Sequence, residues 1–188
     1  MKKNKKQKEV GSPERLSYTK LIRIKKEEKI FWKKYFNVPD DLDAIPVHVK
    51  RVNFRSTDIN DDGLLILVGR VKVIGQLDLD DAEITNEGIS HLTKLDSLTE
   101  LRLKGCTHLD NECLAFLTQI TSLELLHVGS TKITIDGMNN IGSLINLKML
   151  LLSADMAEVQ TKEKLCKLQA ALPGCEVIVN HKLYESED

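Results

Sequence analysis

The chain has 188 residues, of which 41% are hydrophobic, and a formal net charge of −1 at pH 7. This length and composition suit a globular domain with a substantial core, and they exclude a wholly disordered chain. Aromatic residues make up only 4%, so we expect an aliphatic core. Residues 1–36 contain 13 Lys and Arg against 4 Asp and Glu, whereas the rest of the chain contains 14 against 24.

Residues 1–17, MKKNKKQKEVGSPERLS, are predicted to form a basic disordered tail. No apolar run follows them, which argues against a secretory signal, and their high lysine and low arginine content argues against a mitochondrial presequence. The longest aliphatic run, LLILV at 64–68, is too short for a transmembrane segment. Four cysteines without a C-x-x-C pair indicate reduced thiols. We therefore predict a cytoplasmic protein.

Residues 18–36 have the pattern of a basic amphipathic helix that ends before Asn37 and Pro39. This stretch contains the only Trp and four other aromatic residues. We interpret 18–46 as a helical N-terminal cap that covers the end of the following structure. A free helix lying on a membrane surface is the alternative.

The segment DINDDG, Asp58 to Gly63, fits the opening of an EF-hand calcium loop. The twelfth position of that loop needs a bidentate Glu but holds Gly69. Asn60 is a favourable helix N-cap, and the same kind of residue recurs later in the chain at Thr85, Asp110 and Thr134. The sequence therefore predicts a series of helix starts and no calcium site.

An internal repeat explains this recurrence. Its apolar anchors lie 24 or 25 residues apart, at Val52, Leu77, Leu101, Leu126 and Leu150. Each copy predicts a short strand followed by a helix, and such units bury their apolar sides by stacking into a parallel sheet backed by helices. We expect repeats over 47–157, a C-terminal capping helix and strand over 158–180, and an acidic tail over 181–188.

The segment LTELRLKGCTHL (98–109) completes the pattern L-x-x-L-x-L-x-x-N/C-x-L, with Cys106 at the N/C position. The chain thus resembles leucine-rich-repeat proteins of the cysteine-containing and bacterial GALA-like kind. This resemblance implies an α/β solenoid of about five repeats, with a parallel sheet on the concave face and helices on the convex face. The first repeat departs from it with a polar strand, and the fifth loses register after Ser153.

A second resemblance rests on FWKKYFNVP (31–39) and TKEKLCKLQAALPGCEV (161–177). Their layout around the strands is similar to that of the mitochondrial ATP synthase subunit s (coupling factor B) family. It implies a role in assembling or coupling a respiratory membrane complex. GALA-like repeats often accompany an F-box that recruits a ubiquitin ligase, but the first 46 residues are too short to supply that module.

Signatures of enzymes are absent: the chain has no phosphate-binding loop, no dinucleotide fingerprint and no G-x-S-x-G. Cys106, His108 and Cys113 could suggest zinc, but structural zinc needs four converging ligands. The two cysteines are better explained as small buried residues of the repeat. We predict a non-catalytic protein without metal or cofactor.

The concave face is the predicted binding surface. Leu125, His127, Met149 and Leu151 are expected to form an exposed apolar anchor for a protein partner. A second group is expected to set orientation and association rate: Arg51, Arg55, Asp78, Asp80, Arg102 and Lys104. Two alternatives stay open, a ladder of cross-strand ion pairs among the charges and a C-terminal tail that plugs the patch with Leu183 and Tyr184.

We therefore expect a monomeric interaction scaffold for a protein of unknown identity. The alternatives are an adaptor or assembly factor of a larger complex, of ubiquitin-ligase or respiratory type, and association with nucleic acid or an anionic surface through the basic N-terminus. Nucleic-acid binding has less support, because the basic tail has no interleaved aromatic residues and no recognition helix follows it.

Overall fold

The computed structural model describes residues 18–38, 42–138, 140–157 and 160–184. The basic tail predicted over 1–17, the surface association proposed for it, and the last four residues lie outside this part. The chain divides into two compact units, residues 1–44 and 45–188.

The first unit contains helix α1, Tyr18–Phe36, and a short 3₁₀ helix, Leu42–Ala44. Helix α1 has the predicted bounds, and Asn37 after it adopts a left-handed backbone with φ 51°. The ring centroids of Trp32 and Phe36 lie 4.7 Å apart, and Phe31 packs edge-on to Trp32 at 5.1 Å. The capping role of this helix stays a prediction.

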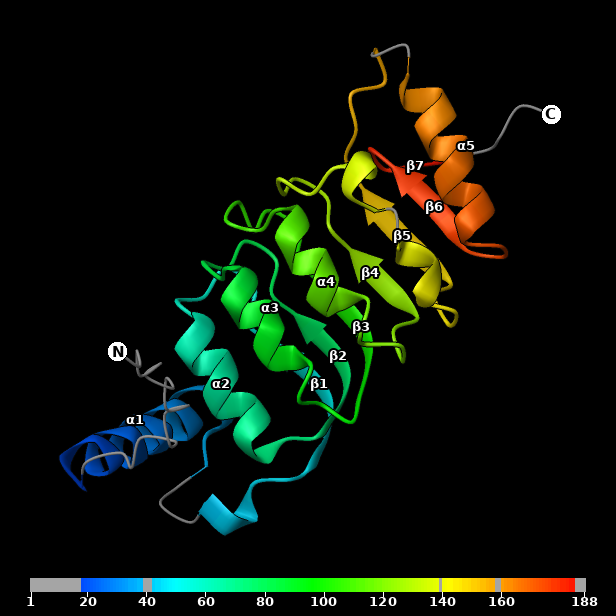
Figure 1. Ribbon diagram of the computed structural model, residues 1–188. Coiled ribbons are helices and arrows are strands. Elements are labelled where there is room, and N and C mark those ends of the chain that lie inside the picture. Colours follow the sequence, from blue (N-terminus) through cyan, green and yellow to red (C-terminus); the bar gives the residue numbers. More distant parts are fainter. Residues whose placement is uncertain (1–17, 39–41, 139, 158–159, 185–188) are drawn as a thin grey trace, which may run out of the picture. The chain divides into compact units, whose positions relative to one another are not determined.

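The second unit is an α/β structure built on a seven-stranded sheet in the order β1 to β7 (Figure 1). Its strands are β1 His48–Asn53, β2 Val73–Asp78, β3 Ser97–Arg102, β4 Leu125–His127, β5 Met149–Leu152, β6 Glu176–Val179 and β7 Lys182–Leu183. Strands β1 to β6 are parallel, and β7 pairs antiparallel with β6. The α/β class with a mostly parallel sheet is therefore confirmed.

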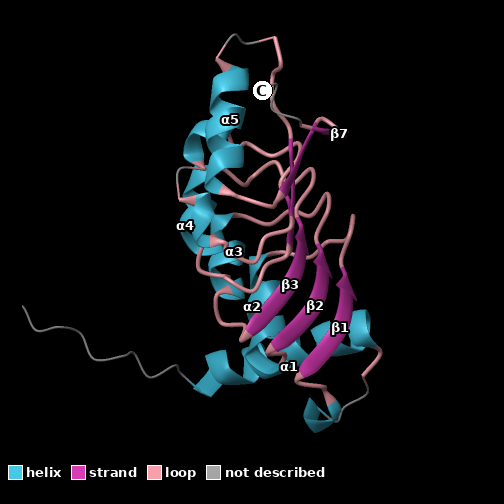
Figure 2. Ribbon diagram, turned by 90° about the vertical axis from the view of Figure 1, so that its right-hand side faces the viewer, coloured by secondary structure: helices cyan, strands magenta, loops and turns pink. Residues whose placement is uncertain are grey.

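Helices lie on one side of this sheet, as Figure 2 shows. They are α2 Asp61–Arg70, α3 Asn86–Leu92, α4 Leu114–Leu117 and α5 Thr161–Ala171. No helix in the described ranges combines the length and the apolar character needed to cross a bilayer.

The five apolar anchors form one continuous row across the sheet. Strand register places Val52 beside Leu77, Leu77 beside Leu101, Leu101 beside Leu126, and Leu126 beside Leu150. Each of these side chains is at most 3% exposed. The regular spacing therefore brings equivalent residues side by side, and burial of this row is a main contribution to the core.

The predicted helix starts are confirmed at three of the four positions. The side chain of Asn60 accepts a hydrogen bond from the Gly63 amide at 3.1 Å, and that of Thr85 accepts one from the Glu87 amide at 3.2 Å. Asp110 caps the short helical segment after β3 in the same way. Thr134 occupies the corresponding position without a side-chain bond. The DINDDG segment thus leads into α2.

A polar ladder that was not predicted from the sequence joins these turns. The residue after each N-cap accepts a hydrogen bond from the backbone amide of the next N-cap along the chain. The Thr85 amide donates to Asp61 Oδ1 at 2.9 Å, the Asp110 amide to Asn86 Oδ1 at 3.3 Å, and the Thr134 amide to Asn111 Oδ1 at 2.9 Å. The next equivalent residue is Ile135, which has no side-chain acceptor. The Asp or Asn that follows each of the first three N-caps was the feature of the sequence that could have predicted this ladder.

The later repeats depart from the predicted strand-and-helix unit. The third has only the 3₁₀ helix Asn111–Cys113 followed by α4, and the fourth has two 3₁₀ helices, Ile135–Gly137 and Ile141–Ser143. The fourth segment contains Gly137, Gly142 and Ser143, which are weak helix formers. Its apolar residues Met138, Ile141 and Leu144 are nevertheless buried. Short 3₁₀ turns therefore provide the packing that a full helix provides in α2 and α3.

Candidate interaction face of the sheet

Side chains alternate between the two faces of a strand, so the residues beside the buried anchors point away from α2 to α5. We call this surface the open face. Register arranges it in rows, of which one is Arg51, Gln76, Glu100, Leu125 and Met149, and the next is Asn53, Asp78, Arg102, His127 and Leu151. Arg55, Asp80 and Lys104 follow two residues beyond the second row. The predicted site residues therefore do share one face.

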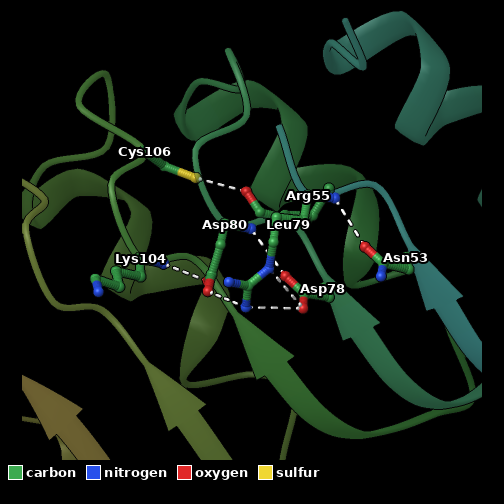
Figure 3. A network of polar contacts seen from close by, with 7 residues as sticks. All are labelled: Asn53, Arg55, Asp78, Leu79, Asp80, Lys104 and Cys106. Carbon is green, nitrogen blue, oxygen red and sulfur yellow. Dashed lines mark hydrogen bonds and ion pairs between the residues drawn. The ribbon is translucent and has the colours of Figure 1, made fainter. Parts of the chain in front are cut away.

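Arg55 holds two acidic residues of the neighbouring strand segment together (Figure 3). Its Nη2 lies 3.1 Å from Asp78 Oδ2 and 2.7 Å from Asp80 Oδ2. The hydrogen bond to Asp78 and the charge of Asp80 raise the pKa of Arg55 above its usual value. One pairing of charges between neighbouring strands, of the kind expected in a cross-strand ladder, is therefore present at Arg55.

The burial of these carboxylates differs from the expectation of an exposed binding group. The side chains of Asp78 and Asp80 are only 5% and 2% exposed. Asp80 Oδ1 accepts the Lys104 backbone amide at 2.9 Å, and Asp78 Oδ1 accepts the Asp80 amide at 3.1 Å. Buried carboxylates require such partners. We conclude that this pair stabilises the ends of β2 and β3 and presents little surface to a partner.

His127 also differs from the predicted exposed side chain, since it is only 8% exposed. Within the described residues its Nδ1 has no hydrogen-bond partner. Burial lowers the pKa of His127, and the neighbouring charges of Arg102, Lys104 and His181 act in the same direction, while Asp80 opposes them. Burial therefore favours the neutral form of the imidazole.

The three apolar residues of the predicted anchor lie together. Leu125 is in register with Met149, and His127 is in register with Leu151. Each of Leu125, Met149 and Leu151 is half-buried, whereas the prediction was an exposed patch. They form a shallow apolar surface, and its role in binding a partner stays a prediction.

The alternative that the C-terminal tail plugs this surface does not hold for the described part of the tail. Leu183 belongs to β7 at the sheet edge, pairs with Ile178 and is 54% exposed. The Tyr184 hydroxyl lies 3.2 Å from Cys166 Sγ on α5. The antiparallel turn before β7 sends these residues along the edge and toward α5, away from Leu125.

The cysteines occupy separate environments. Cys106 and Cys113 are fully buried, and the Cys106 thiol donates a hydrogen bond to the Leu79 carbonyl at 3.1 Å. Burial raises the pKa of Cys106 to about 11 and that of Cys113 to about 12. His108 is exposed, and the described residues contain no group of three or more His, Cys, Asp or Glu side chains that could hold a metal.

Thiol labelling tests these environments. With iodoacetamide at pH 8, we expect the native protein to take up one adduct rapidly, at the exposed Cys166, and the unfolded protein to take up four. The thiolate is the reacting form, and burial disfavours it at the other three cysteines, Cys106, Cys113 and Cys175. For Cys175, burial raises the pKa to about 11. Mass spectrometry of the intact protein counts the adducts. Rapid labelling of Cys113 in the folded protein would contradict this picture.

Comparison with known proteins gives several relatives that carry the same name. The chain is 34% identical over 110 residues to the human protein named ATP synthase subunit s, mitochondrial, and to the same protein of Pongo abelii. It is 30% identical over 115 residues to that of Mus musculus. The human match covers 55% of this chain and 54% of the relative, so the chain spans about half the length of the curated relatives it matches. No family model matches the chain.

These findings support the second resemblance stated from the sequence, and they give no support to the bacterial GALA-like one. The prediction of a non-enzyme agrees with the relatives, which are named as one subunit of a larger assembly. That name does not support the expected monomer.

The prediction of a cytoplasmic protein is wrong, because the relatives in all three species are named as mitochondrial. It rested on reduced cysteines and on the lysine-rich start. Reduced thiols exclude an oxidising compartment only, so they do not distinguish the cytosol from another reducing compartment.

Proposed function

We propose that this chain is a non-catalytic accessory subunit of a mitochondrial complex of the ATP synthase type, and that it binds another protein of that complex through the open face. The similarity to subunit s supports the kind of assembly. The observation that carries the binding role is the half-buried apolar surface of Leu125, Met149 and Leu151 on the sheet face opposite α2 to α5. Contiguous accessible apolar surface on a protein of this kind is typical of an interaction site.

Charged residues around this surface have distinct roles in the proposal. Arg51 is exposed on β1, and Arg102 and Lys104 are partly exposed beside the apolar residues. These three guide the approach of the partner and fix its orientation. Arg55, Asp78 and Asp80 form the internal ion-pair cluster and keep the neighbouring strands in place.

The fold that presents this face is proposed to be a leucine-rich-repeat solenoid over 47–157. The spacing of 24 or 25 residues, the in-register row of anchors and the polar ladder at the turns support it. Residues 18–46 would cap its N-terminal end, and the helix and strand within 158–180 would cap its C-terminal end.

The double variant Leu125→Asp/Leu151→Asp tests the proposal. The tagged full chain is incubated with a native mitochondrial detergent extract, and captured proteins are identified by mass spectrometry. We expect the unaltered chain to capture ATP synthase subunits and the variant to lose at least nine-tenths of them, because an anion in each apolar contact is costly to desolvate. Circular dichroism verifies that the variant is folded.

The matched control is Leu65→Asp/Ile145→Asp, which places the same charges at two exposed positions, one on α2 and one in the turn before β5. Leu65 is 41% exposed and Ile145 is 83% exposed, so capture should be unchanged. Failure of the unaltered chain to capture ATP synthase would contradict the proposed complex. Equal capture by both double variants would contradict the assignment of the open face.

A further inference from the structure

Two cations on the open face lack the internal partners that Arg55 has. Within the described residues, Arg102 Nε is buried without a hydrogen-bond partner, and no carboxylate pairs with Arg102 or with the Lys104 ammonium. Figure 3 shows the Lys104 side chain pointing away from Asp80, which contacts only its backbone amide. A buried donor without an acceptor carries a free-energy cost.

His127 adds a second unsatisfied group beside them. It is in register with Arg102, and its Nδ1 is buried without a partner in the described residues. A small hollow next to the ring is lined by Lys104, His127, Leu151 and His181, among others, and no carboxylate is among its lining residues. Gly129 contributes to this hollow, and a Cβ there would lie 3.0 Å from His127 Nε2.

The carboxylates nearest to Arg102 and Lys104 already pair with Arg55 and offset these two cations only in part. Asp78 lies beside Arg102 in register, but Arg55 occupies its Oδ2, and Asp80 is held in the same way. Glu100 lies one row away, next to Leu125. Arg55, Arg102 and Lys104 exceed Asp78 and Asp80 by one charge, so the surface around Arg102 and Lys104 is weakly positive. Arg102 lies one strand from Leu125 and two strands from Leu151.

This pairing of cations with apolar surface indicates the chemistry of the partner. Resting on the proposed function, we propose that the open face recognises an acidic segment of a protein, with an Asp or Glu carboxylate bound by Arg102 and Lys104 beside His127. An apolar side chain of the same segment packs on Leu125, Met149 and Leu151. Neighbouring strands are about 4.8 Å apart, so a segment that crosses the strands can place both groups. A nucleic acid would satisfy the cations but has no aliphatic side chain for the apolar residues.

Carbodiimide cross-linking tests this inference, because the reagent joins an ammonium to a carboxylate that it touches. The tagged full chain and a native mitochondrial detergent extract are treated together, and the peptides linked to Lys104 are sequenced. We expect Lys104 to be joined to an Asp or Glu that has an apolar residue within a few positions. Lys104→Arg should keep the captured partner and lose this cross-link, since it retains the charge but not the ammonium.

Charge reversal tests the inference quantitatively, by measuring affinity for the partner that the cross-link identifies. Arg102→Glu/Lys104→Glu is expected to weaken binding by at least tenfold, and the loss should shrink as salt is raised. The control Lys94→Glu/Lys132→Glu changes the net charge equally at two exposed positions away from the open face and should leave affinity within about twofold.

The outcomes separate this inference from the proposed function. A Lys104 link to an ATP synthase subunit supports both, and a link to an acidic segment of another protein supports the inference alone. Capture that depends on Leu125 and Leu151 without any Lys104 link overturns the inference and leaves the proposed function standing. Absence of any capture through this face overturns both, and a partner consisting of nucleic acid overturns the protein partner.

Discussion

Leu101→Ala is expected to lower the free energy of unfolding by about 2–5 kcal/mol. The side chain is fully buried on β3, inside the parallel sheet, in register with Leu77 and Leu126. Truncation would leave a cavity between two rigid strands and the helices behind them, and neighbouring anchors cannot move into it without breaking register. Because domains are stable by only about 5–15 kcal/mol, this loss is a large share of the total.

Urea unfolding followed by circular dichroism measures this effect. The control is Ile145→Ala, which truncates a side chain that is 83% exposed and should change stability by no more than about 0.5 kcal/mol. If Leu101→Ala costs no more than the control, the row of anchors is not the main core of the sheet. Glu100 and Arg102 flank Leu101 on the open face. Measuring partner capture by Leu101→Ala would therefore also show how far binding depends on an intact sheet.

The fold was largely predictable because its signal is repeated along the chain. One apolar residue says little about structure, but five anchors at a spacing of 24 or 25 residues require equivalent units, and stacking of such units requires a parallel sheet. The N-caps Asn60, Thr85 and Asp110 were predictable for the same reason. The 3₁₀ turns around Gly137 were not, since a helix and a 3₁₀ turn can bury the same apolar residues.

The site was less predictable because it depends on which side chains contact each other. Alternation along the strands correctly placed Arg55, Asp78 and Asp80 on one face, but it could not show that Arg55 reaches both carboxylates and buries them. The same limit applied to His127, which is in register with Arg102 and Leu151 and is buried. Period and alternation assign a residue to a face, whereas exposure on that face depends on contacts across strands.

Two glycine-to-alanine substitutions should shift stability in opposite directions. Gly75→Ala is expected to destabilise the protein by about 1–3 kcal/mol, because a Cβ on β2 would lie 2.6 Å from the backbone carbonyl oxygen of Lys50. That oxygen belongs to the neighbouring strand β1, so the clash is relieved only by separating the two strands. Gly69→Ala is expected to stabilise by about 0.5–1 kcal/mol, because alanine favours the helix and, apart from the adjoining backbone of α2, nothing lies within 4 Å of the added methyl group.

Comparing the two substitutions separates the effect of the close approach of β1 to β2 from the general effect of replacing glycine on stability. Both changes reduce the flexibility of the unfolded chain equally, so the difference between the two unfolding free energies reports on the folded state. Stabilisation by Gly75→Ala would mean that β1 is more loosely attached than the register of Arg51 with Gln76 indicates. In that case the first strand, which carries Arg51 and leads to Arg55, would be able to move when the open face binds its partner.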